Sequence, residues 1–197
     1  SAEGVSCTGT DLVQRLARER GAKAMAICNV IESTIARESD GVLYTHAGPE
    51  IGVASTKAFT CQLAVLAALA AHMAVAKGRL TRDQEAEIVR HLLEAPAALN
   101  AALAHDDDIA AMAHLIAPAR DVLYLGRGQD YPLALEGALK LKEISYIHAE
   151  GYASGEMKHG PIALIDEEMP IVAIVPHDNV YEKMLSNIQE VKARGAS

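Results

Sequence analysis

Three charged residues, Glu136, Lys140 and Glu143, have the spacing that places side chains on one face of a helix. They stand at positions i, i+4 and i+7 of a Leu- and Ala-rich run, so neighbours along the row can form ion pairs. A carboxylate beside an ammonium group in a closed pocket can act as a general base. The spacing alone favours a solvated row of ion pairs, and a general base is the alternative.

His159 lies in a Gly- and His-rich stretch, residues 147–160, for which we expect irregular structure. Gly160 and Pro161 follow it directly and indicate an exposed, rigid loop. An imidazole titrates near neutral pH and can therefore move protons. A purely structural hydrogen bond is the alternative role for this side chain. The other histidines are scattered and show no metal-ligand spacing, so we predict no metal site.

Residues 47–57 (AGPEIGVASTK) form a loop that precedes a long Ala- and Leu-rich run. Gly52 permits close backbone approach to a ligand, and Ser55 and Thr56 offer hydroxyl groups near a helix start. Free N–H groups and the helix dipole at such a place suit a phosphate. The favoured interpretation from the pattern is an ordinary helix cap by Ser55. The GRGQD loop at 126–130 matches a nucleotide fingerprint poorly, and we expect a tight turn there.

Alternating strand and helix patterns must position these residues. Strands are predicted at 24–30, 41–45, 121–125 and 169–175, and helices at 10–20, 55–76, 131–146 and 179–194. The apolar part of the second helix, residues 63–76, is too short for a bilayer span and is expected to be buried.

Residues 81–117 have a helical pattern throughout, with a capping box of Thr81 and Gln84, a break at Pro96 and a second helix from Asp106. The predicted fold class is α/β, with two doubly wound parallel-sheet α/β/α units, both incomplete, joined by a helical connector. The predicted limits are 1–79 for the first unit, 80–112 for the connector and 113–197 for the second unit.

The composition limits the class of protein. The chain has 197 residues, half of them apolar, and a net charge of −8 without a basic block. This balance argues against nucleic-acid and membrane partners. Three cysteines without metal or disulfide spacing favour a reducing cytoplasm. No signal segment is apparent, and the start at Ser1 suggests a fragment of a longer chain.

Four strings of residues carry a family resemblance. They are EIGVASTKAF at 50–59, LYLGRGQD at 123–130, ALEGALKLKEIS at 134–145 and HAEGYASGEMKHGP at 148–161. The chain closely resembles the glutamine–fructose-6-phosphate aminotransferase family, in the isomerase half that is built from two sugar-isomerase (SIS) domains. The resemblance runs from about Gly21 to Gly195. It implies two doubly wound α/β domains and the conversion of fructose 6-phosphate and glutamine-derived ammonia into glucosamine 6-phosphate.

The resemblance also implies roles for three catalytic residues. Glu143 would be the base that moves a proton between C1 and C2 of the sugar, and Lys140 would tune it. His159 would open the sugar ring and reach into the site of a neighbouring subunit, so a homodimer is implied. No metal or organic cofactor takes part in the family's reaction.

Substrate contacts are implied at Val53 and Ser55, and at Ser1 and Ser6, which match the family's phosphate loop in part. The family's glutaminase domain, a further partner on the same parent chain, has no match here. Neither has the Schiff-base lysine of the family. Two other functions stay open: a non-catalytic SIS module that binds a sugar phosphate, and an SIS deglycase or isomerase of another amino-sugar phosphate.

Overall fold

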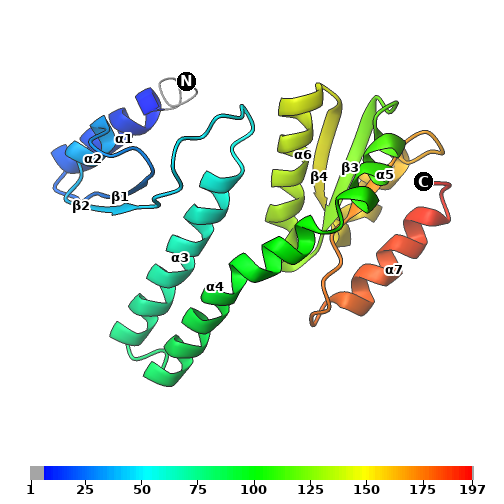
Figure 1. Ribbon diagram of the computed structural model, residues 1–197. Helices are drawn as coiled ribbons and strands as arrows, with labels where there is room; N and C mark the ends of the chain where they lie inside the picture. The colour runs from blue at the N-terminus through cyan, green and yellow to red at the C-terminus, as the bar shows by residue number, and fades with distance from the viewer. Residues whose placement is uncertain (1–6, 197) are drawn as a thin grey trace. The chain divides into compact units, whose positions relative to one another are not determined.

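The computed structural model describes residues 7–196 of the chain, which divide into two compact units (Figure 1). The first unit ends at Ala101 and the second begins at Ala102. In each unit parallel strands alternate with helices, which is the α/β class that the sequence predicts. Ser1 and Ser6, two of the predicted substrate contacts, lie outside the described residues.

The first unit contains a two-stranded parallel sheet and its helices. In chain order the elements are α1 (Cys7–Glu19), β1 (Met25–Cys28), α2 (Thr34–Arg37), β2 (Gly41–Tyr44), α3 (Lys57–Ala76) and α4 (Arg82–Leu103). Met25 pairs with Gly41 and Cys28 with Tyr44, so the two predicted strands are in parallel register. Gly21 follows α1 in the left-handed conformation (φ 83°), and its N–H donates to the Arg18 carbonyl at 2.9 Å, as glycines that end helices commonly do.

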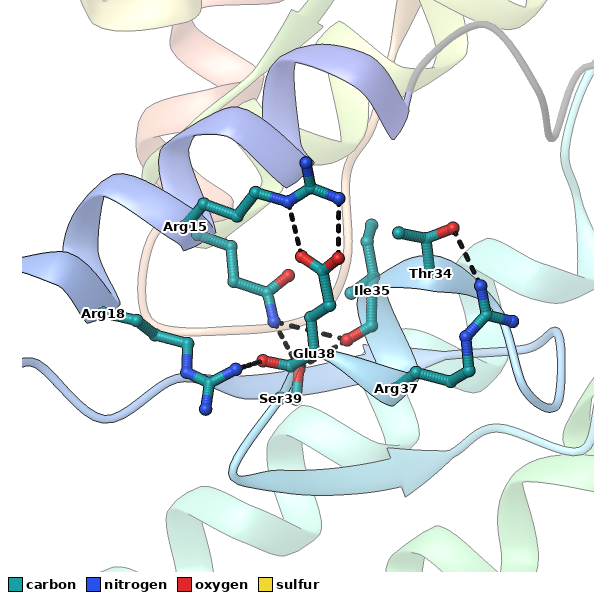
Figure 2. Close-up of polar contacts among 8 residues, drawn as sticks. Arg15, Arg18, Thr34, Ile35, Arg37, Glu38 and Ser39 are labelled. Atoms are coloured by element: carbon teal, nitrogen blue, oxygen red, sulfur yellow. Dashed lines mark hydrogen bonds and ion pairs between the residues drawn. The ribbon is translucent and has the colours of Figure 1, made fainter.

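Helix α1 is attached to α2 mainly by polar contacts, which Figure 2 shows. The Arg15 guanidinium donates two hydrogen bonds of 2.6 Å to the Glu38 carboxylate, and Arg18 donates one to the Glu38 carbonyl. The hydrogen bond from Arg15 lowers the pKa of Glu38. Because the Arg15 side chain is 56% exposed and that of Glu38 is 31% exposed, solvent screens the attraction and the pairs chiefly fix geometry.

Helix α4 begins with the predicted capping box. The Gln84 N–H donates to Thr81 Oγ1 (3.2 Å), and the Thr81 N–H donates to Gln84 Oε1 (2.9 Å). The predicted break at Pro96 is wrong, because the helix continues through this residue to Leu103. A proline removes only one backbone donor, and the Ala- and Leu-rich sequence around it favours helix.

Replacing Thr81 with alanine is expected to lower the free energy of unfolding by about 1 kcal/mol, because the Gln84 N–H loses its acceptor. Urea unfolding followed by circular dichroism measures this difference. Thr81→Ser keeps the hydroxyl group and serves as the control. Equal unfolding midpoints for Thr81→Ala and Thr81→Ser would contradict the prediction.

Helix α3 is not the buried helix that its composition predicts. By length and composition it could cross a membrane, and only 6% of its most apolar window is buried. One such helix is weak evidence for a membrane span, since the core helix of a soluble protein passes the same test. Among the described residues of this unit only four apolar side chains are buried, and all are alanines: Ala26, Ala36, Ala54 and Ala71. Two short strands therefore leave the apolar faces of α3 uncovered.

The second unit is a three-layer α/β/α arrangement. In chain order its elements are α5 (Asp106–Ile116), β3 (Asp121–Gly126), η2 (Gly128–Asp130), α6 (Tyr131–Ser145), β4 (His148–Ala153), η3 (Ser154–His159), η4 (Pro161–Leu164), β5 (Ile171–Ala173) and α7 (Tyr181–Lys192). The parallel sheet has the order β4-β3-β5. Helices α4 and α5 occupy the stretch for which a connector is predicted, and the boundary between the units lies within it.

Alternate residues of β3 build the two cores of this unit. Val122 packs with Ala138 and Ala149 on the face that α6 covers, beside β4 and β3 in Figure 1. Leu123 and Leu125 point to the other face, in a cluster that includes Met157 of η3 and Met184 of α7. The apolar run DVLYLG is thus buried on both faces, as expected for a central parallel strand.

Strand β4 corrects the expectation of irregular structure over 147–160. Its sequence, HAEGYA, contains neither β-branched residues nor an apolar alternation, so the pattern does not predict a strand. Small residues are needed there because α6 approaches closely. A Cβ on Gly151 would lie 2.8 Å from Leu135 Cα, and Ala149 is fully buried.

Candidate active site

Helix α6 carries an ion-pair row formed by Glu136, Lys140 and Glu143. Lys140 Nζ lies 2.9 Å from Glu143 Oε2 and 3.2 Å from Glu136 Oε1. These side chains are between one fifth and one third exposed, so the row is only partly solvated. The structure thus brings together two of the three predicted catalytic residues, and Lys140 holds one oxygen of the Glu143 carboxylate in place.

The two carboxylates of the row raise the pKa of Lys140. Burial by itself would lower the pKa of Lys140, but the hydrogen bonds to Glu143 and Glu136 outweigh burial and raise it. Lys140 therefore stays an ammonium group at physiological pH. Apolar side chains that are 40–70% exposed flank the row on α6: Leu133, Leu139 and Ile144. A row of charged side chains between apolar ones is suited to bind a polar ligand when another surface covers the ligand from the opposite side.

The raised pKa of Lys140 predicts a pH dependence of stability. A lysine whose pKa is higher in the folded state than in the unfolded state stabilises the fold at low and neutral pH. That contribution is lost as the pH rises from the unfolded value, about 10.4, through the folded pKa. We expect the unfolding free energy of the wild type to fall more steeply than that of Lys140→Met between roughly pH 9 and pH 11.5.

Urea unfolding at several pH values measures this difference. Lys142→Met removes an exposed lysine from the same helix and is the matched control. Its pH profile should follow that of the wild type. Parallel profiles for all three proteins would contradict the assigned role of the ion pairs.

His159, the third predicted catalytic residue, ends the short helix η3. Its side chain is 75% exposed, and its nearest carboxylate, Glu156, is 4.0 Å away. The segment itself is well anchored, because Met157 is buried and Lys158 pairs with Glu190 of α7 at 2.9 Å. Gly160 follows with a φ of 149°. His159 is therefore an exposed imidazole on a fixed support, and its neighbour Glu156 is not a member of the ion-pair row on α6.

Val53 and Ser55 lie in the first unit, on the loop 45–56 that leads into α3. Val53 is 79% exposed and Ser55 is partly buried. Ser55 does not cap the helix, contrary to the favoured interpretation. Thr56 occupies the cap position without a side-chain hydrogen bond, and the Glu50 carboxylate accepts from the Ala58 N–H at 3.0 Å. One first-turn N–H of α3 is thus already bound by a carboxylate.

Three polar residues that stabilise loops or helix starts were not predicted from the sequence. Asn29 and Glu50 bind the loop 45–56, and Asp130 is buried at the start of α6. Burial, and after it the charge of Asp178, raises the pKa of Asp130. Only their positions near the ends of predicted strands, or in the loops that follow them, could have indicated them, because ligand-binding loops of parallel sheets begin there.

Comparisons with known proteins agree with this architecture. The family model described as SIS domain matches residues 4–72 and 115–197, which is more than half of the chain. The chain is 68% identical over 181 residues to the glutamine–fructose-6-phosphate aminotransferase [isomerizing] of Zymomonas mobilis and 61% identical to that of Mesorhizobium japonicum. Each alignment covers 92% of this chain and 30% of the relative, so the chain spans under a third of their length.

The fold of this chain is similar to that of a solved structure. It is the C-terminal domain of glucosamine-fructose-6-phosphate aminotransferase from Francisella tularensis, with a TM-score of 0.93 and 49% identity. The match covers 95% of this chain and 53% of that one. The family match and the parallel-sheet architecture together establish that this chain belongs to the SIS domain family.

Proposed function

We propose that this chain is part of the isomerase half of an enzyme that makes glucosamine 6-phosphate from fructose 6-phosphate and glutamine-derived ammonia. The observation that carries the proposal is the pair of Lys140 and Glu143 at 2.9 Å, within a sequence 68% identical to a named aminotransferase. A carboxylate held by an ammonium group on a rigid helix is suited to move a proton between adjacent carbons.

Each of the three polar side chains has one chemical task in this proposal. Glu143 takes the proton from one carbon of the open sugar and returns it to the neighbouring carbon. Lys140 holds that carboxylate in place. His159 opens the ring by donating a proton to the ring oxygen and accepting one from the anomeric hydroxyl.

Val53 and Ser55 contact the sugar phosphate from the loop 45–56, and Ser1 and Ser6 contact its phosphate group. The exposure of His159 suits a residue that completes the site of a second subunit, so the working form is a homodimer. The glutaminase domain that supplies ammonia belongs to the same parent protein, which works in the cytoplasm.

An exchange of segments tests this function. The matching 181 residues of the Zymomonas mobilis relative are replaced by this sequence, and glucosamine 6-phosphate formation from fructose 6-phosphate and glutamine is measured. We expect the chimera to keep a rate within about tenfold of the unaltered relative, since 68% of the aligned residues are identical. A folded chimera without this activity would overturn the proposal.

A further inference from the structure

The loop 45–56 has little apolar packing to hold it. Ile51 is 92% exposed and Val53 is 79% exposed, whereas Ala54 is the buried apolar residue of this stretch. His46 and Gly48 both have positive φ angles, 50° and 72°. A histidine in this conformation carries a cost that surrounding contacts must offset. The shape of the loop therefore depends on its polar contacts.

Asn29, which directly follows β1, makes three of those contacts with a single side chain. Its Nδ2 donates to the Gly48 carbonyl at 2.6 Å. Its Oδ1 accepts from the Ala47 N–H at 2.8 Å and from the Thr45 hydroxyl at 3.0 Å, which occupies both acceptor sites of the amide oxygen. These bonds surround the two positions with positive φ and fix the direction in which the loop leaves β2.

Glu50 fastens the other end of the loop. Its Oε2 accepts from the Ala58 N–H of α3 at 3.0 Å, in a partly buried contact that links residues eight positions apart. Val53 and Ser55 lie within the stretch that this bond closes. A carboxylate at a helix start is also favoured by the helix dipole. The side chains of Asn29 and Glu50 together tie both ends of the loop to regular elements.

We infer that Asn29 and Glu50 are positioning residues, which fix the loop 45–56 in the shape that binds a sugar phosphate. They act through backbone groups of Ala47, Gly48 and Ala58 and need no contact with the sugar itself. The inference rests on the proposed function, because that function gives the loop its ligand. It goes further by assigning residues of this chain that hold the loop before the ligand arrives.

Two readouts on the 197-residue chain test this inference. Hydrogen exchange followed by mass spectrometry reports the order of the loop, and calorimetric titration with glucosamine 6-phosphate reports binding. In Asn29→Leu and Glu50→Leu we expect at least about fivefold faster exchange within 45–58, because each variant loses hydrogen bonds that hold the loop. We expect affinity to fall by about fivefold as well. Glu50→Gln, whose amide oxygen still accepts a hydrogen bond, should restore much of both.

Gln14→Leu is the matched control. Gln14 donates to Ile35 O at 3.3 Å and Ser39 Oγ at 2.8 Å in the same unit, away from the loop. This variant should leave exchange within 45–58 and affinity within about twofold of the wild type. Unchanged exchange in α1 of the loop variants shows that the unit as a whole stays folded.

The outcomes separate the inference from the proposed function. Wild-type exchange within 45–58 in both leucine variants would overturn the inference, as would wild-type affinity in both. If the wild-type chain does not bind glucosamine 6-phosphate, the proposed function loses its support. The exchange rates then still decide whether Asn29 and Glu50 hold the loop.

Discussion

Replacing Glu143 with glutamine is expected to lower the rate of glucosamine 6-phosphate formation by about 100- to 10,000-fold, the usual contribution of a general base. Glutamine keeps the shape of the side chain, and its amide oxygen can still accept a hydrogen bond from Lys140. The amide cannot take up the proton that the carboxylate transfers. The measurement is the steady-state rate of the chimera with the Zymomonas mobilis relative, with and without the substitution.

Glu182→Gln makes the same chemical change at an exposed position of α7 and should leave the rate unchanged. Glu136→Gln is informative in a second way, since it removes the charge of one partner of Lys140 and leaves the pair with Glu143 intact. Its effect should be much smaller than that of Glu143→Gln. A Glu143→Gln chimera that keeps more than about a tenth of the rate would exclude Glu143 as the base.

Replacing Gly126 with alanine is expected to cost the second unit about 3 kcal/mol or more of unfolding free energy, at the upper end of the usual cost of overpacking. Gly126 ends the central strand β3, where the chain turns tightly into η2. A Cβ there would lie 2.2 Å from the Asp130 carbonyl oxygen and 2.7 Å from the Tyr131 nitrogen. Both are backbone atoms, so the turn itself must shift. Urea unfolding followed by circular dichroism measures the loss.

Gly155→Ala is the control within the same unit. The nearest atom to a Cβ at that position is Arg127 Nη1 at 3.2 Å, the end of a flexible side chain that can move aside. We expect a change of less than about 1 kcal/mol for this variant. Equal stabilities of Gly126→Ala and Gly155→Ala would contradict the described turn.

Strongly apolar and well-capped elements could be predicted from the sequence. The strands MAIC, GVLY and DVLYLG and the capping box of α4 lie where periodicity and cap residues place them. Strand β4 could not be predicted because α6 approaches it closely and selects Ala149 and Gly151 in place of β-branched residues. The exposure of α3 could not be predicted either, because composition shows how apolar a helix is and does not show what covers it.

The candidate site could be predicted only in part. Helical spacing places Lys140 beside Glu143, and the structure has this pair at 2.9 Å. The exposed position of His159 also agrees with its Gly-Pro surroundings. Asn29 and Glu50 bind backbone groups that lie 18 and eight positions away along the chain, and the spacing of residue types does not predict such contacts. A carboxylate from within the loop, rather than Ser55, binds the start of α3.

Calorimetric titration of this chain with glucosamine 6-phosphate, with glucosamine as the control, shows whether the chain binds a sugar phosphate. If this chain carries a site for a sugar phosphate, glucosamine 6-phosphate binds saturably and glucosamine does not, because the phosphate supplies much of the recognition. Circular dichroism of the same sample establishes that it is folded. A folded chain that binds neither ligand, or binds both equally, would contradict the claim that this chain carries a sugar-phosphate site.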